Sequence, residues 1–183
     1  MTRKPAPGRL ELVAEFVNTI DLLTGSETFC DPRSLAAWLS ERGLLQGQAA
    51  PVTEQDLDET IALREALRGL LAANNGTGPT DLAALNARTH DLALRVVFGE
   101  EGGAVLEATG DGVRAALAEV IGVVFTALTD GTWSRLKVCR EGSCRWAYYD
   151  RSKNHSSAWC SMESCGNRAK ARAYRARGAE EPV

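Results

Sequence analysis

Apolar residues recur at helical spacing through most of the first 130 positions of the chain. From Leu10 to Leu23 they occupy every third or fourth place, which predicts a helix with one face against a core. The same spacing predicts four more helices, over 34–45, 54–73, 80–92 and 113–128. The last of these is the most apolar, so we expect it at the centre of the fold.

Polar residues at the starts of three of these segments match helix caps. Asp31 precedes Pro32, an acidic cap followed by the proline that a first helical turn tolerates. Thr53 and Asp56 have the spacing of a capping box, and Thr80 can cap the fourth helix. These residues predict where the second, third and fourth helices begin.

Two short apolar segments, 94–98 and 104–108, are predicted strands, and the Glu-Glu-Gly-Gly between them predicts a hairpin turn. No apolar run approaches the roughly 18 residues that a membrane span needs. The chain also opens without the pattern of a secretory signal. We therefore expect a soluble, cytoplasmic protein that makes no contact with a membrane.

Charge is divided unevenly along the chain, whose formal net charge is -3. Residues 133–177 hold 11 Lys and Arg against 3 acidic residues, whereas the remainder holds 10 basic and 21 acidic residues. Four of the five cysteines and all three tyrosines also lie in the basic part. We therefore predict two domains, an acidic, mainly helical one over 1–131 and a basic one over 132–183.

Four cysteines in the basic part have the spacing of a metal site. Cys139 and Cys144 form one C-x4-C pair, Cys160 and Cys165 form a second, and 15 residues separate the pairs. Four thiolates in two close pairs suit tetrahedral zinc, and the gap is long enough for a turn that brings the second pair back. Because four protein ligands leave no position for water, we predict one structural Zn²⁺ and no catalytic metal.

Other readings of these cysteines are disulfides, free thiols or iron–sulfur ligation. The missing secretory signal disfavours disulfides, and iron–sulfur clusters use tighter cysteine runs. His155 is a candidate fifth ligand, which we interpret as a loop residue because four cysteines already complete the site. Several nearby cations are expected to offset the negative charge of a four-thiolate centre. They are Lys137, Arg140, Arg145, Arg168 and Lys170.

The predicted finger is too small to fold on apolar burial alone. We expect Trp133, Trp146 and Trp159 to form a small core of its own beside the metal. Tyr148 and Tyr149 either join that core or stack on nucleobases, as aromatic residues of RNA-binding proteins do. The pattern leaves the role of the tyrosines open.

Helical spacing from residue 167 onward separates two basic faces. One face carries Arg168, Arg172 and Arg175, which we expect to project from a scaffold that the metal holds rigid, and nearly opposite lie Lys170, Tyr174 and Arg177. An alanine strip at 169, 173 and 176 is expected to pack on the zinc core, and Gly166 is expected to relieve the backbone before the helix.

Basic residues are concentrated enough here to suggest a binding surface. Arg151 and Lys153 in the connecting loop add to the cations of the helix, as in a protein that binds phosphate backbones. A solvated basic helix at the end of the chain is the alternative interpretation.

The stretch WCSMESCGNRAKARAYRAR, preceded by CREGSCRWAYYDRSKNHS, resembles the CGNR zinc finger of bacteria, whose signature stands here at 165–168. FVNT at 16–19, followed by Asp21, resembles the ABATE-type domain that usually precedes that finger. Together the two resemblances cover nearly the whole chain. They imply a stress-related transcriptional regulator, with the four cysteines as zinc ligands and the basic helix as the DNA contact. Before Cys160 this chain has Ser156, Ser157 and Ala158 where the family commonly carries arginine.

We therefore expect a mainly α fold with a small β-hairpin: a helical N-terminal domain followed by a treble-clef-like zinc finger with four cysteine ligands. The finger is predicted to bind DNA, which would associate the protein with the nucleoid. RNA binding through Tyr148 and Tyr149, or docking onto an acidic protein, are the alternatives. No P-loop, dinucleotide motif or open zinc site is present in the sequence, so we expect no enzyme activity.

The role of the acidic domain stays open between sensing and assembly. Asn18, Thr19 and Asp21 are polar positions inside the first apolar helix pattern. They either hydrogen-bond other helices in the core or line a pocket for a small-molecule effector. Assembly into a homodimer is a further alternative for this domain.

Overall fold

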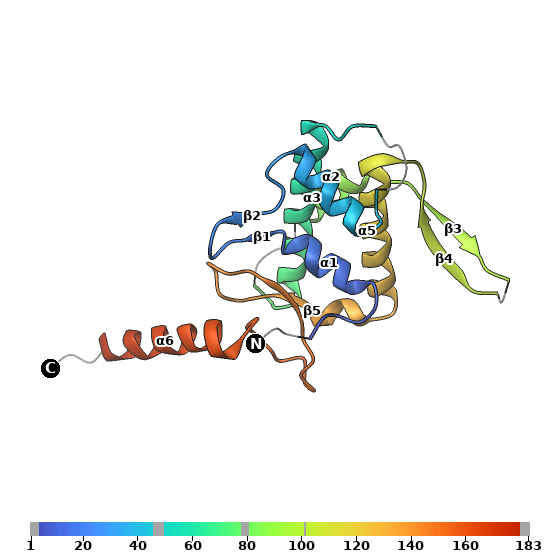
Figure 1. Ribbon diagram of the computed structural model, residues 1–183. Coiled ribbons are helices and arrows are strands. Elements are labelled where there is room, and N and C mark those ends of the chain that lie inside the picture. Colours follow the sequence, from blue (N-terminus) through green and yellow to red (C-terminus); the bar gives the residue numbers. More distant parts are fainter. Residues whose placement is uncertain (1–3, 46–49, 78–80, 101, 180–183) are drawn as a thin grey trace.

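A computed structural model describes residues 4–45, 50–77, 81–100 and 102–179. Five helices form the body, with α3 and α5 side by side and α1 across their lower half (Figure 1). Their bounds are α1 Leu10–Val17, α2 Pro32–Glu41, α3 Glu54–Ala73, α4 Leu82–Thr89 and α5 Gly112–Thr129. The prediction of a mainly α fold is confirmed.

Predicted caps begin two of the helices. The Asp31 carboxylate accepts from the Ser34 backbone N–H at 2.7 Å, and the Ser34 hydroxyl oxygen accepts from the Asp31 N–H. Thr53 and Asp56 form the same reciprocal box at the start of α3. For the fourth helix, Asp81 accepts from the Ala84 N–H, and Thr80 lies outside the described residues. Ser34 and Asp56 therefore take the place that Glu has in the usual capping box.

The first two helices are shorter than predicted. α1 ends at Val17 because the Asn18 side chain is bound to the backbone of Ala147, far along the chain. A two-residue strand, β1 (Ile20–Asp21), follows and pairs with β2 (Ser26–Glu27), so the prediction of helix as far as Leu23 is wrong. α2 stops at Glu41 rather than 45, just before Gly43 with its φ of +67°.

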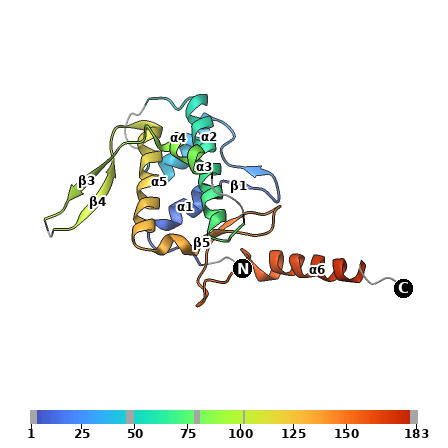
Figure 2. The same ribbon diagram turned by 180° about the vertical axis from the view of Figure 1, so that it is seen from behind.

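Both predicted strands are present as an antiparallel hairpin, β3 (Leu94–Phe98) and β4 (Ala104–Ala108). The hairpin leaves the body beside α5 and projects into solvent on the side opposite α6 (Figures 1 and 2). Its base packs closely on α5: a methyl group placed on Gly122 would lie 3.5 Å from Leu94 Cδ2.

One hydrophobic core runs through the helical body and into the start of the predicted finger. The finger contributes a 3-10 turn, η1 (Thr132–Arg135), and the strands β5 (Leu136–Val138) and β6 (Ala147–Tyr149), which pair antiparallel. Trp133, Leu136 and Val138 are buried in the same cluster as Phe16 and Leu67 of the helices. The expected separate core is confirmed only in part: Trp159 and Tyr148 pack with the cysteines in a second cluster, whereas Trp133 belongs to the main core and Trp146 is 37% exposed.

In the described part of the chain, α5 has the length and composition of a membrane span, with a mean hydropathy of 1.6 over 18 residues. The prediction that no apolar run approaches this length is wrong for α5. Half of the helix is buried inside the protein, as expected for the central helix of a packed body. The face of α5 that packs inside the protein carries the buried residues Val120, Ala116 and Leu117.

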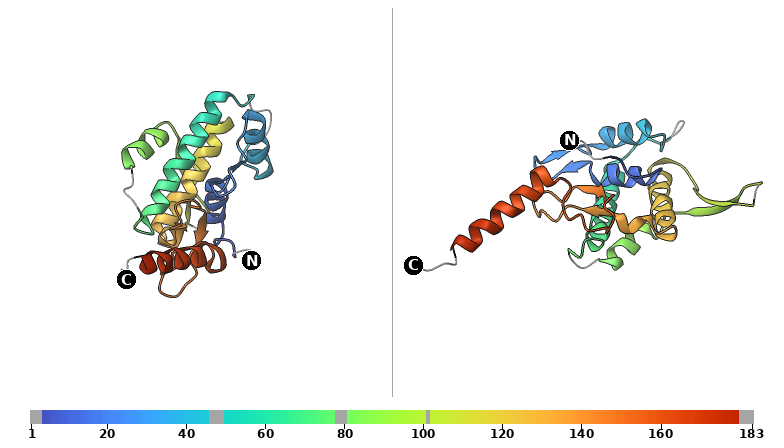
Figure 3. Two further views of the ribbon diagram at one scale, coloured as in Figure 1. Left: turned by 90° about the vertical axis from the view of Figure 1, so that its left-hand side faces the viewer. Right: turned by 90° about the horizontal axis from the view of Figure 1, so that it is seen from below.

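The C-terminal elements leave the body. After β6 comes a loop, then a π-helical turn, η2 (Met162–Gly166), which continues into α6 (Asn167–Ala179). α6 extends away from the other helices and touches the body only near its first turns (Figure 3). The treble-clef arrangement of hairpin, loop and helix around the cysteines agrees with the prediction.

Candidate metal centre and basic helix

The first cysteine pair lies in the turn that connects β5 to β6. Cys139 follows directly after β5, and its N–H donates to the Trp146 carbonyl. The backbone N–H groups of Cys144 and Arg145 both donate to the Glu141 carbonyl, at 2.8 and 3.0 Å, which closes a tight loop. Arg145 completes the turn in the left-handed region with a φ of +45°. This loop aims both sulfurs at the same point.

The second pair straddles the start of η2. Ser161 caps the turn by accepting from the Ser164 N–H, which leaves Cys160 before the turn and Cys165 within it. This agrees with the expectation that no regular helix joins the two cysteines. Gly166, however, lies outside the left-handed region. A Cβ there would lie 2.5 Å from Met162 Sδ and 3.2 Å from Trp159 Cδ1, so the glycine provides space and not backbone freedom.

The four sulfurs fit a tetrahedral zinc ion. All lie within 4.8 Å of one another, and the Cys144–Cys160 and Cys160–Cys165 sulfurs are 3.7 Å apart. A tetrahedron with Zn–S bonds of about 2.3 Å has S–S edges of about 3.8 Å. A disulfide would require about 2.05 Å, and the five cysteines are all free thiols. Cys139, Cys144, Cys160 and Cys165 therefore form the site of one structural zinc ion.

The pKa values of these thiols also indicate that the site needs a cation to hold several thiolates. Hydrogen bonds from Cys144 and Cys160 lower the pKa of Cys139 to about 2. The hydrogen bond with Cys139 raises the pKa of Cys144 to about 12, and the pKa of Cys160 rises for the same reason. Protein groups alone thus favour a thiolate at Cys139 and protonated thiols at Cys144 and Cys160, because further anions would repel at these distances. A divalent cation among the sulfurs offsets this repulsion and stabilises the thiolate form of the ligands.

His155 lies apart from the metal ligands. It is exposed in the loop after β6 and, among the described residues, the ligand cluster consists of the four cysteines. Its interpretation as a loop residue agrees with this position.

One cation contacts a ligand sulfur. Arg168, the arginine of the CGNR signature, donates from Nη2 to Cys165 Sγ at 3.1 Å. Lys137 is instead buried in a pair with Asp150 at 2.8 Å, and Arg140 donates to the Asn75 carbonyl. The expectation that Lys137 offsets the thiolate charge is therefore wrong, because Asp150 already neutralises it, whereas Arg140 keeps its charge beside Cys139 and bonds the finger to the helical body.

The Lys137–Asp150 pair is itself a buried ion pair within the finger. Burial raises the pKa of Asp150, but hydrogen bonds from Lys137, Ser152 and Ser157 outweigh it and hold the value at about 2. Asp150 therefore carries its charge at neutral pH and binds the loop that leads to the second cysteine pair.

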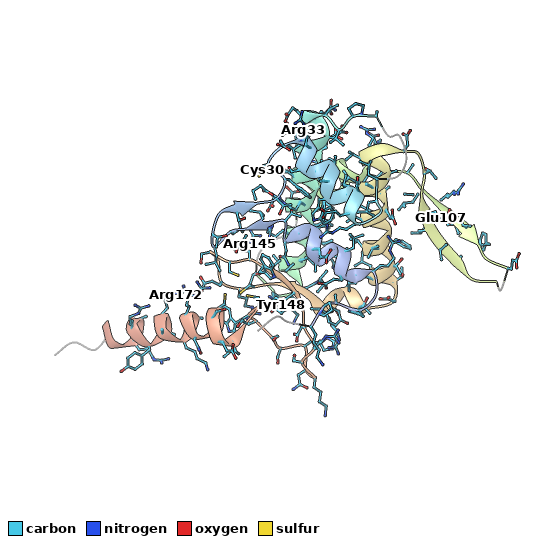
Figure 4. All side chains as sticks on the ribbon, in the orientation of Figure 1. Cys30, Arg33, Glu107, Arg145, Tyr148 and Arg172 are labelled. Carbon is cyan, nitrogen blue, oxygen red and sulfur yellow. The ribbon has the colours of Figure 1, made fainter. Side chains whose placement is uncertain are left out.

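A second arginine ties α6 to the cysteine turn. Arg172 donates from both terminal nitrogens to the Glu141 carboxylate, at 3.1 and 2.5 Å, and these bonds hold the pKa of Glu141 below its ordinary value. Figure 4 shows Arg172 on the first half of α6, near the body. The face with Arg168 and Arg172 thus turns toward the finger in its first turns. The expectation that this face projects freely is wrong there.

Beyond its first turn α6 is surrounded by solvent. Ala169 is half-buried, but every side chain over 170–177 is exposed, including Ala173 and Ala176. The expected packing of the alanine strip on the zinc core is therefore wrong. In the described part of the chain, Lys170, Arg175 and Arg177 make no ion pair, and Tyr174 is 74% exposed.

The candidate nucleic-acid contacts in the loop and among the tyrosines also include both exposed side chains and side chains bound within the protein. Lys153 is exposed, whereas Arg151 donates to the Pro5 carbonyl at 2.6 Å and lies 5.5 Å from the centre of the Tyr149 ring. Tyr148 is 4% exposed and its hydroxyl donates to the Ser157 carbonyl. Because that ring is inside the finger, its predicted use for stacking on nucleobases is wrong.

Polar side chains of the helical body fasten the finger in place. Asn18 makes two bonds to the Ala147 backbone, and Arg68 bridges the carbonyls of Val17 and Arg145. Asn74, at the end of α3, donates to the carbonyls of Trp133 and Leu136 at 2.8 Å each. In the sequence the Asn-Asn pair indicates only the end of a helix. Its position just after the long helix carries no further signal.

The three candidate pocket residues line a groove of about 770 Å³ between the body and the finger. They follow α1 and do not interrupt it. Asn18 and Thr19 have protein partners, since Thr19 donates to the Phe16 carbonyl and accepts from Arg64. Asp21 accepts from the Leu23 N–H at 2.8 Å. Cys144, Cys160 and Cys165 also line the groove, so it touches the metal centre.

Comparison with known families accounts for both parts of the chain. Residues 10–131 match the ABATE family, described as "Putative stress-induced transcription regulator". Residues 135–178 match the CGNR zinc finger, and this range contains all four zinc ligands and most of α6. No curated protein matches the chain. Because the first match covers well over half of the residues, the chain belongs to the ABATE family and carries a C-terminal CGNR zinc finger.

Proposed function

We propose that this protein is a DNA-binding transcriptional regulator that contacts the phosphate backbone through α6. The observation that carries the proposal is the charge and the exposure of that helix. α6 has five cations and no acidic residue, and it projects from an otherwise acidic protein. An exposed cationic helix at the edge of a protein suits the electrostatic recognition of duplex DNA.

The contacts on α6 assign two roles to its cations. Arg168 and Arg172 are bound to the metal ligand Cys165 and to Glu141, so they position the helix. Lys170, Arg175 and Arg177 are the cations offered to phosphates, and Tyr174 is exposed among them. The proposed DNA-binding residues therefore differ from the face with Arg168, Arg172 and Arg175 that the sequence alone favours.

The bound state would also complete the fold of α6. A helix of 13 residues without an apolar face is marginally stable in water by itself. The zinc site fixes its first turn, and phosphates along the outer side would neutralise charges that repel one another further along. We propose a binding role and not a catalytic one, acting at the nucleoid in the cytoplasm.

Salt-dependent binding to duplex DNA tests the proposal. We expect the wild-type affinity to fall steeply with salt, and Lys170→Ala with Arg177→Ala to weaken binding at least tenfold and flatten the salt slope by about two. The matched control, Arg33→Ala with Arg88→Ala, removes two cations from α2 and α4, outside the proposed interface, and should leave binding unchanged.

Three results would contradict the proposal. An unchanged affinity in the α6 variant would remove the helix from the interface. Tighter binding to single-stranded RNA than to duplex DNA would favour the RNA alternative. The absence of salt-sensitive binding to any nucleic acid would favour docking onto an acidic protein.

We further propose that the groove beside Asn18 receives a small-molecule effector. Its walls come from the helical body and from the cysteine loop, so a ligand there would touch both parts of the chain. Aromatic and acidic side chains, Trp38, Tyr149 and Glu15, lie on these walls. Thermal-shift screening of small organic cations and neutral compounds tests this. A ligand is expected to raise the melting temperature of wild type and to lose this effect in Trp38→Ala, whereas no stabilising ligand would count against the pocket.

A further inference from the structure

The projecting β3–β4 hairpin has an apolar face that its own chain covers only at one end. Direct partners in the register share a face, which here carries Leu94, Val96, Phe98, Ala104, Leu106 and Ala108. Leu94 and Leu106 pack over Gly122 of α5. Farther out, Val96 is 56% exposed and Phe98 77% exposed. The hairpin thus extends an apolar surface beyond the helix that covers its base.

A groove of about 680 Å³ continues this surface along the free edge of β4. Three consecutive residues of β4, Ala104 to Leu106, line it together with Gly122 and Phe125 of α5. Val96 of β3 lines it too and shares the apolar face with Ala104 and Leu106, so the groove lies between that face, β4 and α5. Among the described residues β4 pairs with β3 alone, so its outer edge keeps unused backbone donors and acceptors.

The charges around the groove favour a neutral, apolar partner. Arg9 and Glu119, at its rim, pair with each other. Arg95 and Glu107 pair across the other face of the hairpin. Natural edge strands usually carry unpaired charges or proline against strand addition, and β4 has neither. An acidic nucleic acid would meet no unpaired cation among these residues.

From these features we propose that a second copy of the chain occupies the groove, with the two β4 strands paired antiparallel about a twofold axis. Antiparallel pairing of a strand with its own copy is symmetric, so one free edge serves both partners. The product is a four-stranded sheet, β3-β4-β4-β3, with both α5 helices on one face. Phe125 and Leu128, each 52% exposed on α5, would then lie between those helices.

The available area fits a specific dimer. At their exposures, Val96, Phe98, Phe125 and Leu128 each offer on the order of 100 Å². Two copies would therefore bury about 800 Å² from these side chains, close to the roughly 1,000 Å² expected of a specific interface. The new backbone pairs and the rim add to this.

Sedimentation equilibrium in a reducing buffer with zinc tests the inference, the reductant excluding a disulfide through exposed Cys30. Wild type is expected at twice its 19.7 kDa chain mass in the micromolar range. Phe125→Glu should weaken the dimer at least a hundredfold by placing a charge between the two α5 helices, and Ala104→Lys should act likewise on the apolar face of β4. The control Leu82→Lys alters an equally exposed apolar residue on α4 and should have no effect.

Each variant changes an exposed side chain, so circular dichroism and zinc content should match wild type. Mixing Phe125→Glu with Phe125→Lys should restore association, because opposite charges then meet between the two α5 helices. A monomeric wild type, an unaffected Phe125→Glu dimer, or a mixture that stays monomeric would overturn the proposal. The readout is mass, so its failure is separate from any failure of DNA binding.

Discussion

The β5–β6 hairpin and α6 are held by the same four sulfurs but have opposite surroundings. All three residues of β5 are buried, and Asn18, Arg68 and Asn74 bond the hairpin region to the helical body. α6 is exposed over 170–177 and meets the rest of the chain through η2 and the Arg172–Glu141 pair. The sequence divides the chain at about residue 131, whereas packing changes most sharply after Cys165.

This difference gives the metal two separate effects. In the hairpin, zinc adds to a core and a hydrogen-bond network that are already extensive. For α6, zinc and two arginine contacts are what hold the first turn, because the helix buries no apolar face of its own. The zinc ion therefore adds stability to a hairpin that is already well packed, whereas α6 depends on it for its attachment to the protein. Removing individual contacts should separate these effects.

Loss of the metal should have the largest effect. Elemental analysis should find one zinc per chain, and Cys165→Ser or a strong chelator should remove it. Structural zinc supplies on the order of 10 kcal/mol of binding free energy, so the melting temperature should fall by more than about 10 °C. Hydrogen exchange should show α6 amides becoming unprotected while those of β5 and β6 retain protection from the shared core.

The control for that experiment is Cys30→Ser, which alters an exposed cysteine outside the cluster and should change nothing. If chelation removed protection from β5 and α6 to the same extent, the proposed difference between the two elements would be refuted. An unchanged melting temperature would count against the zinc site itself.

The next effect in size is expected from the buried pair in the hairpin. Asp150→Asn leaves the Lys137 ammonium without its counter-charge, on a residue that is 4% exposed, which should cost about 3–5 kcal/mol in the free energy of unfolding at pH 7. Lys137→Met together with Asp150→Asn should recover part of this loss, since no lone charge remains buried. Urea unfolding of the zinc-loaded proteins measures both. Full additivity of the two changes would show that the pair is uncoupled.

The same pair has a defined pH dependence. The folded pKa of Asp150, about 2, lies below its ordinary value of 3.8, so its charge stabilises the fold above pH 4 and loses that effect as pH falls toward 2. The linkage amounts to about 2 kcal/mol. The stability gap between wild type and Asp150→Asn should therefore shrink below about pH 4. Because both proteins carry the same thiolates, acid release of zinc does not contribute to the difference.

What the sequence predicts here depends on how local the determining contacts are. α3 and the β3–β4 hairpin have the predicted bounds, because caps and turn residues within a few positions decide them. The metal ligands are equally predictable, since thiol chemistry at close spacing leaves few alternatives. The end of α1 is not, because Asn18 bonds to Ala147, 129 residues away.

The basic helix shows the same limit at the functional site. Helical spacing correctly separates its two faces, but spacing contains no information on which face meets the body. Glu141 decides that, and its approach to Arg172 depends on the cysteine turn and the π-helical turn together. The division of cations into positioning and binding groups could therefore not be predicted from charge patterns.

The smallest effect on stability is expected from Arg172→Ala. The Arg172 side chain is 57% exposed but Glu141 is 4% exposed, so the variant leaves a carboxylate that keeps its bond from Ser143 and loses its counter-charge. The melting temperature should therefore fall by a few degrees, less than for Asp150→Asn. Amides in the first half of α6 should also exchange faster, because the helix loses a contact that fixes its direction. Arg175→Ala is the matched control, since Arg175 makes no ion pair among the described residues. If both variants left exchange in α6 unchanged, zinc and Arg168 would suffice to hold the helix, and the Glu141 contact would have no positioning role.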